Sequence, residues 1–166
     1  MGPVGEVRIV PDPETFVALP YAPGAGAMVA DLIKIDGSPW EACPRTFLKQ
    51  ALAELAGAGY SMQASFEPEF TVGVREASPA APTIPDRLIP IDDSLCYSAT
   101  GFHQGHEFAM ELVTALEEQG LEVKHYYPEL GHGQHELSIR HAGALRAADN
   151  HVMYRETVRG VAFRRG

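Results

Sequence analysis

Apolar and polar residues follow strand-like patterns in several short segments of this chain. The strongest strand prediction covers residues 27–35, where apolar residues dominate and partly alternate with polar ones. Shorter extended patterns cover 6–10 and 16–19. Residues 121–127 and 134–139 flank a turn that contains glycine, so we expect these two segments to form an antiparallel pair.

Three segments show the helical period instead. Proline suits the first position of a helix, so a helix is predicted to begin at Pro44 and to end near Gly57 and Gly59. Two further helices are predicted over 106–119 and 142–163. Their expected core-facing residues are Phe47, Leu48, Ala51, Leu52 and Leu55, then Phe108, Leu112, Ala115 and Leu116, and finally Leu145, Ala148, Val152, Tyr154 and Val158.

Together these elements predict an α+β fold with mainly antiparallel strands and flanking helices. The segment 78–90 contains four prolines, and we expect it to be a surface loop. With 166 residues and no repeats or convincing linker, the chain is expected to form one domain segment with its own core.

Composition excludes several classes of protein. The net charge of −9 argues against nonspecific nucleic-acid binding, which depends on basic patches. No apolar run approaches the ~20 residues that span a membrane, and the first residues do not have the pattern of an export signal. The 2 cysteines form no CxxC pattern, so we expect a protein of the reducing cytoplasm.

Two glutamates in the segment FEPEF, Glu67 and Glu69, are the first candidates for chemistry. At a spacing of two residues in a strand, both carboxylates point from one face, with Cα atoms about 7 Å apart. Pro68 between them favours a sheet edge or a bulge. Carboxylates so placed suit neighbouring divalent cations of the kind that assist phosphoryl transfer.

Two more glutamates, Glu129 and Glu136, lie in the segment PELGHGQHE. Gly131 and Gly133 between them permit a tight turn that directs both carboxylates to one point. The alternative is that all four glutamates are ordinary surface charges of an acidic protein. A second alternative is that His132 and His135, in the same segment, bind a transition metal beside Glu129 and Glu136. We do not assign these two histidines as ligands.

Other motifs carry weaker signals. His103 and His106 are spaced like two helical ligands, but we assign them a capping or surface role because no third ligand lies nearby. The glycines of 24–27 precede an extended segment, whereas a phosphate-binding loop opens a helix. Cys96 has no identifiable base partner, and serine-nucleophile motifs are missing, so no covalent nucleophile is predicted and no catalytic residue is assigned.

Segments in a fixed order carry a resemblance to a known family. Residues 10–52 are similar to the opening of the catalytic domain of the glutamine synthetase family, and FEPEF at 66–70 is similar to that family's first metal-binding segment. The segments 92–102, 106–123 and 128–166 follow in the family's order. The resemblance implies that residues 1–166 are part of this catalytic domain. It places the small β-rich N-terminal domain and the C-terminal half outside these residues.

The resemblance also implies a reaction. In the family, glutamate attacks the terminal phosphate of ATP, and ammonia displaces phosphate from the resulting γ-glutamyl phosphate to form an amide. Mg²⁺ or Mn²⁺ neutralises the phosphates. By resemblance, Glu69, Glu129 and Glu136 hold the cation nearer glutamate, while Glu67 holds the cation that bridges the nucleotide phosphates, with a histidine outside this chain.

Two residues of this chain depart from the family pattern. Lys124 stands where relatives often carry an acidic residue near the nucleotide, and Cys43 stands where they commonly carry a capping aspartate.

We expect the chain to be inactive alone, and to associate with copies of itself or with complete synthetase subunits. The alternatives are a ligase that uses a polyamine or monoamine in place of ammonia, and a noncatalytic metal-binding or partner subunit.

Overall fold

A computed structural model describes residues 5–76 and 87–166, in which helices alternate with short strands. Every described strand pair is antiparallel, which confirms the predicted α+β class. The helices are α1 (Pro44–Gly57), α2 (Ala99–Glu118) and α3 (Ala144–Arg165), with a short 3-10 helix, η1 (Pro13–Thr15). The strands are β1 (Val7–Pro11), β2 (Val17–Ala18), β3 (Gly26–Ala27), β4 (Ala30–Lys34), β5 (Gln63–Ala64), β6 (Glu69–Thr71), β7 (Gly73–Glu76), β8 (Arg87–Pro90), β9 (Val123–Pro128), β10 (Gln134–Ile139) and β11 (Ala142–Gly143).

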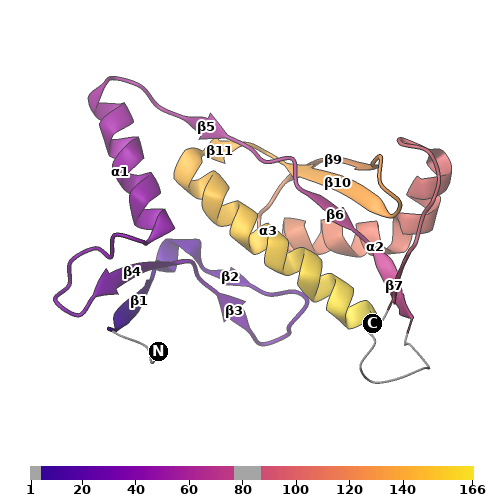
Figure 1. Cartoon of the computed structure of the whole chain (residues 1–166), viewed down its shortest axis with the longest axis horizontal. Coiled ribbons are helices and arrows are strands. Elements are labelled where there is room, and N and C mark those ends of the chain that lie inside the picture. Colours follow the sequence, from indigo (N-terminus) through magenta and orange to yellow (C-terminus); the bar gives the residue numbers. More distant parts are fainter. Residues whose placement is uncertain (1–4, 77–86) are drawn as a thin grey trace.

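Helix α3 crosses the middle of the molecule (Figure 1). On one side lie α2 and the sheet of order β6-β10-β9, and on the other lie the ribbons β1-β4 and β2-β3 (Figure 1). The core forms where α2, α3 and the three-stranded sheet meet, since a helix stripe and a sheet face each need an apolar partner. Its buried members are Phe108, Leu112, Ala115, Leu116, Leu121, Leu137, Met153, Tyr154 and Val161.

The predicted hairpin of 121–127 and 134–139 is confirmed as β9 and β10. The apolar face of α2 is also confirmed, because its four predicted residues are buried. The helix begins earlier than predicted, at Ala99, where the Ser98 hydroxyl accepts a hydrogen bond from the Thr100 N–H at 3.1 Å. This capping hydrogen bond allows α2 to begin before the first residues of its apolar face.

None of the helices in the described residues is long and apolar enough to cross a membrane.

Helix α1 has the predicted bounds, but its apolar stripe is not buried as predicted. Phe47 remains 69% exposed, and the helix projects from the rest of the molecule (Figure 1). Val152 on α3 is likewise 48% exposed rather than in the core. The helical period places residues on one face, but only a neighbouring element can cover that face. Within the described residues, the main contacts of α1 are with β4 and α3.

Two extended predictions need correction. The single strand expected at 27–35 is two strands, β3 and β4, which pair with different partners. The loop expected at 78–90 is only partly within the described residues, since 78–86 lie outside them. Within it, Arg87–Pro90 forms β8 and pairs with β7. A two-stranded ribbon tolerates Pro90 because proline at the end of a strand removes only one donor from the ladder.

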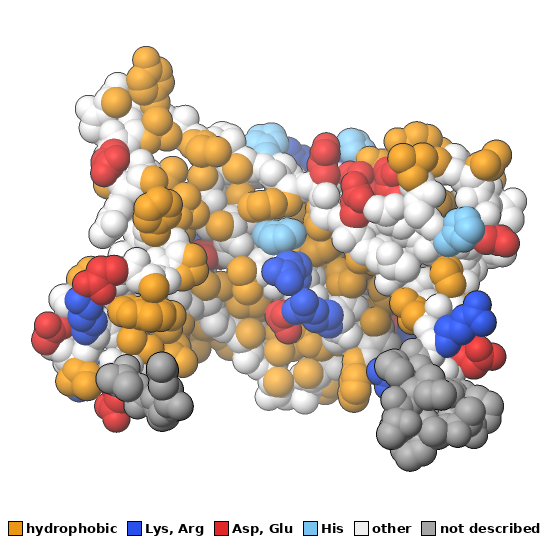
Figure 2. Space-filling model, in the orientation of Figure 1, with side chains coloured by type: hydrophobic (Ala, Val, Ile, Leu, Met, Phe, Trp, Pro, Cys, Tyr) orange, Lys and Arg blue, Asp and Glu red, His pale blue; other side chains and the backbone are white. Residues whose placement is uncertain are grey.

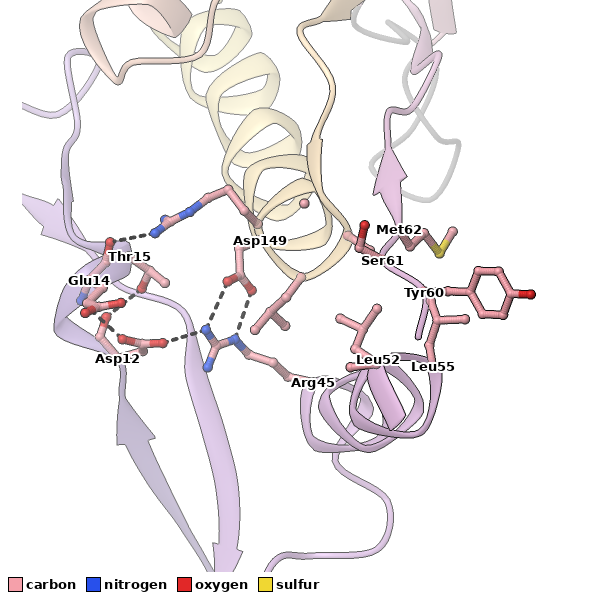
Figure 3. A pocket seen from close by; sticks show the side chains of 15 residues that line it. Asp12, Glu14, Thr15, Arg45, Leu52, Leu55, Tyr60, Ser61, Met62 and Asp149 are labelled. Carbon is pink, nitrogen blue, oxygen red and sulfur yellow. Dashed lines mark hydrogen bonds and ion pairs between the residues drawn. The ribbon is translucent and has the colours of Figure 1, made fainter. Parts of the chain in front are cut away.

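A buried arginine on α1 joins the β1-β4 ribbon to α3 (Figure 3). Arg45 is 8% exposed, and its Nε and Nη2 donate to the two carboxylate oxygens of Asp149 at 2.9 and 3.0 Å. Its Nη2 also donates to Asp12 at 2.6 Å, and its Nη1 donates to Asp31 at 3.2 Å. The hydrogen bonds that Arg45 donates, above all those to Asp149, raise the pKa of Arg45. The hydrogen bond that Asp12 accepts from Arg45 lowers the pKa of Asp12. One side chain therefore links β4, α1, α3 and the turn after β1.

We expect Arg45→Met to destabilise the fold strongly. The substitution leaves the Asp149 carboxylate, which is 7% exposed, buried without its cation. Loss of one partner of such a pair costs about 3–5 kcal/mol in the free energy of unfolding. Urea denaturation at neutral pH measures this loss. Arg159→Met, at an exposed arginine on α3, is the matched control, and equal losses in the two variants would contradict the role of Arg45.

A second prediction concerns pH. Burial, together with the nearby Arg155 charge, lowers the pKa of His151 in the folded chain. In the unfolded chain this pKa returns to about 6.5. The unfolded chain therefore binds more protons as the pH falls through that value, and stability decreases. We expect His151→Gln to reduce the change in urea midpoint between about pH 7.5 and 5.5. His141→Gln, at an exposed histidine, should retain the wild-type slope.

Candidate carboxylate site

The pairing of β6 with β10 places Glu69 directly opposite Glu136. Directly opposed residues in an antiparallel pair have Cβ atoms about 4.5–5.5 Å apart and point to the same face of the sheet. Glu136 is 6% exposed, whereas Glu69 lies open at the edge strand. Two glutamates far apart in the sequence thus form a neighbouring carboxylate pair.

Glu129 lies at the end of the β9-β10 hairpin, where its N–H donates to the Gln134 carbonyl at 2.7 Å. Of the two glycines predicted to permit this turn, Gly133 has the left-handed φ of +65°. A Cβ atom there would lie 2.4 Å from the Val72 carbonyl oxygen, so glycine is required by close approach as well as by φ. The turn of the hairpin is therefore held against Val72, just before β7. Glu129 lies at the end of the sheet that also carries Glu69 and Glu136.

Each of three predicted carboxylates has its own hydrogen-bond partner. Glu69 accepts from the Gln134 side-chain amide, and Glu129 accepts from the Leu130 N–H at 3.1 Å. Glu136 accepts from the Tyr127 hydroxyl, which raises the pKa of Tyr127 to about 12. Glu67 lies before β6, outside a strand, and is exposed.

In this arrangement the described residues contain no group of three or more His, Cys, Asp or Glu side chains that could hold a metal ion. The donor chemistry suits a hard divalent cation, since all four side chains offer carboxylate oxygens. The structure brings Glu69 and Glu136 together, but it does not gather Glu67 and Glu129 with them into a closed ligand set. These residues alone therefore fit a metal only in part.

Sequence reasoning did not identify the aromatic residues around the glutamates. The Tyr97 and Tyr127 rings meet edge to face with centroids 5.1 Å apart. The charge of Glu129 raises the pKa of Tyr97, and Cys96 Sγ lies 4.0 Å from a Glu129 carboxylate oxygen. Tyr97 has φ of +58°, which is uncommon for a residue with a side chain. No sequence pattern gives this position, because the strain is compensated by contacts with a distant hairpin.

The histidines of the hairpin do not join the carboxylates. His135 is fully buried and bonds through Nδ1 to the Tyr126 hydroxyl at 3.0 Å. It points to the opposite face from Glu136, because adjacent residues of a strand alternate. His132 is exposed on the turn. The structure thus separates His135 from the carboxylate pair and gives it a core position.

Acidic side chains gather over β6 and β10 on the face shown in Figure 2. Such a concentration of like charge is unfavourable unless a cation or hydrogen-bond donors offset it. The hydrogen bonds from Gln134, Leu130 and Tyr127 supply part of that compensation. This surface therefore has the charge and the donor atoms to attract a divalent cation.

Comparison with known proteins identifies the family. Residues 41–166 match the sequence model of the glutamine synthetase catalytic domain, and residues 1–40 match that of the glutamine synthetase N-terminal domain. This chain belongs to the glutamine synthetase family. The assignment of 1–40 to the N-terminal domain differs from our expectation of catalytic-domain sequence throughout, and the division of the chain into domains remains a prediction.

Individual relatives in the glutamine synthetase family support the assignment. The chain is 33% identical over 165 residues to gamma-glutamylpolyamine synthetase GlnA3 of Streptomyces coelicolor, covering 99% of this chain and 34% of the relative. It is 30% identical over 161 residues to glutamine synthetase of Halobacterium salinarum, covering 95% and 34%. A solved GmaS/ADP complex aligns with a TM-score of 0.81 at 27% identity, covering 100% of this chain and 37% of that one. The chain spans about a third of the length of these relatives.

The contact between Tyr127 and Glu136 gives a prediction for the site. We expect Glu136→Gln to lower the pKa of Tyr127 from about 12 towards the ordinary value of about 10, since the hydrogen bond to the carboxylate and the carboxylate charge, which both oppose ionisation, are removed. Titration of tyrosinate absorbance, with Tyr127→Phe variants to assign the signal, measures the shift. Glu118→Gln is the control at an exposed glutamate, and an unchanged Tyr127 titration in Glu136→Gln would show that the contact is not formed.

Proposed function

We propose that this chain is part of an ATP-dependent carboxylate–amine ligase that joins glutamate and ammonia through a γ-glutamyl phosphate. The observation that carries the proposal is the cross-strand pair of Glu69 and Glu136, with Glu129 at the same end of the sheet. Family membership supports ligase chemistry, and the ADP complex of the GmaS neighbour supports the use of a nucleotide.

Glu67, Glu69, Glu129 and Glu136 are the proposed ligands of Mg²⁺ or Mn²⁺. A divalent cation would supply neutralisation of the phosphate charges while phosphate is transferred. The Glu69 carboxylate accepts from Gln134 through one oxygen, so its second oxygen would be available to the cation. Completion of the ligand set requires ligands from outside this chain, because the described residues do not form a closed set. We therefore propose that the chain is inactive alone.

A second candidate function replaces ammonia with an organic amine. The relative from Streptomyces coelicolor is a gamma-glutamylpolyamine synthetase, and its identity of 33% supports this possibility. A polyamine carries several positive charges, and the acidic surface over β6 and β10 would attract it (Figure 2). A third candidate, a noncatalytic subunit that binds metal or associates with complete synthetase subunits, requires only the carboxylates and a docking surface.

A chimera tests the proposed chemistry. Residues 1–166 would replace the matched third of the Streptomyces coelicolor relative, and phosphate release would be measured with ATP, glutamate, and either ammonia or a polyamine. We expect turnover by the chimera and none by the isolated chain. Glu136→Gln in the chimera should lower kcat about 100-fold or more, within the range for loss of charge stabilisation at a reacting phosphate.

The matched control in the chimera is Glu118→Gln, which removes an exposed carboxylate from α2. Full activity of the Glu136→Gln chimera would contradict the proposed role of the carboxylate pair. Robust turnover by the isolated chain would contradict its proposed inactivity. The ratio of rates with ammonia and polyamine decides between the first two candidate functions.

A further inference from the structure

A cavity separate from the carboxylate site lies between η1, the end of α2 and the first half of α3. Its volume is about 370 Å³, within the range of about 300–1,000 Å³ that is usual for small-molecule sites. None of the four proposed metal ligands lines it. Three of the residues that do line it, Glu14, Thr15 and Asp149, are labelled in Figure 3. The described residues form this cavity from segments that are far apart in the sequence.

One wall of the cavity is apolar. It is formed by Phe16, Val17, Val29, Leu121 and Met153. Leu121 and Met153 are also members of the buried core, so this wall is held in place by packing. An aliphatic group that enters the cavity would be removed from water against this wall, which favours its binding.

Gln119 lines the cavity at the end of α2. Its Nε2 donates to the Ala115 carbonyl and to the Thr157 hydroxyl, both at 2.8 Å. A carbonyl oxygen only accepts, so the contact with Ala115 fixes the orientation of the side-chain amide. The Oε1 atom of Gln119 is buried without a hydrogen-bond partner in the described residues. Buried polar atoms are nearly always paired in folded proteins, so this oxygen indicates a missing donor.

Two opposite charges at the cavity lack ion-pair partners. The Arg146 Nη2 atom donates to the Glu14 main-chain carbonyl at 3.2 Å. Within residues 5–76 and 87–166, neither the Arg146 guanidinium nor the Glu14 carboxylate belongs to an ion pair. Asp149 also lines the cavity, but both of its carboxylate oxygens accept from Arg45. The cavity therefore presents one uncompensated cation and one uncompensated anion on neighbouring residues.

This pair of charges restricts the class of ligand. A dicarboxylate would place a negative charge beside Glu14 and the C-terminal end of α2, where the carbonyl groups carry partial negative charge. A diamine would place a positive charge beside Arg146. A zwitterion complements both charges, and in an α-amino acid the ammonium and carboxylate groups are bonded to one carbon, as neighbouring opposite charges require. The apolar wall suits an aliphatic side chain.

We propose that this cavity binds a free α-amino acid with an aliphatic side chain. The carboxylate of the ligand accepts from Arg146, its ammonium group donates to Glu14 and to the unpaired oxygen of Gln119, and its side chain packs on Leu121 and Met153. Glutamate is excluded because its second carboxylate would lie against the apolar wall without a partner. The inference goes beyond the proposed function, since binding here requires neither metal nor turnover.

Calorimetric titration of leucine into the 166-residue chain, without metal or nucleotide, tests the proposal. We expect saturable binding. Isoamylamine has the same aliphatic group but no carboxylate, and isocaproate has it but no ammonium group. Each should bind about tenfold more weakly than leucine or worse, because each lacks one charge-assisted hydrogen bond. Binding of either analogue as tightly as leucine, or no leucine binding by the folded chain, overturns the inference.

Variants of the two charged residues separate the two ends of the ligand. Arg146→Gln should weaken leucine binding about tenfold and leave isoamylamine binding within about twofold of wild type. Glu14→Gln should weaken leucine binding similarly and leave isocaproate binding unchanged. Arg159→Gln and Glu54→Gln, at other exposed charges, are the matched controls. The inference is overturned if Arg146→Gln binds leucine as tightly as Arg159→Gln does.

Nuclear magnetic resonance of isotope-labelled methionine methyl groups locates the ligand. The Met153 signal, assigned with Met153→Leu, should shift when leucine is added, whereas the signal of Met110, which does not line this cavity, should not. A shift of Met110 without a shift of Met153 would place the ligand elsewhere and overturn the inference. Glu136→Gln should bind leucine as the wild type does, so failure of the proposed ligase chemistry and failure of this site give different results.

Discussion

The short ladder between β6 and β10 determines the geometry of the carboxylate site. It pairs Glu69 with Glu136 and leaves Phe70 and His135 on the face towards the core. Since side chains alternate along a strand, a slip of one residue would turn a glutamate into the core and expose His135. The close approach of Gly133 to the Val72 carbonyl helps to fix this register, because no other residue fits there.

Helix α3 supports the site, the core and the N-terminal ribbons from different faces. Met153 and Val161 pack into the core with α2, while Asp149 holds Arg45 and through it the β1 and β4 segments. Another stripe of the same helix, which includes Tyr154 and Val158, lies beside β6. One helix thus contacts the candidate site, the core and the N-terminal segments.

Carboxylate charges are compensated in two different ways in this molecule. Around Arg45 the acidic side chains are paired with a buried cation, and the ion pairs hold separate elements together. Over β6 and β10 the carboxylates receive hydrogen bonds from Gln134, Leu130 and Tyr127, but they are not included in the described ion pairs. Hydrogen-bond donors compensate a carboxylate less completely than a full positive charge does. The second cluster therefore retains the capacity to attract a cation.

The sequence by itself determined the fold class, the start of α1 at Pro44, the β9-β10 hairpin and the apolar face of α2, because periodicity, proline and glycine act locally. It also selected the four glutamates, and the resemblance of ordered segments indicated the family. Only the tertiary structure decided that Glu69 and Glu136 face each other, that Tyr127 and Tyr97 lie near Glu129 and Glu136, and that α1 remains exposed. These features depend on strand register and on contacts between residues far apart in the chain, and local patterns do not specify either one.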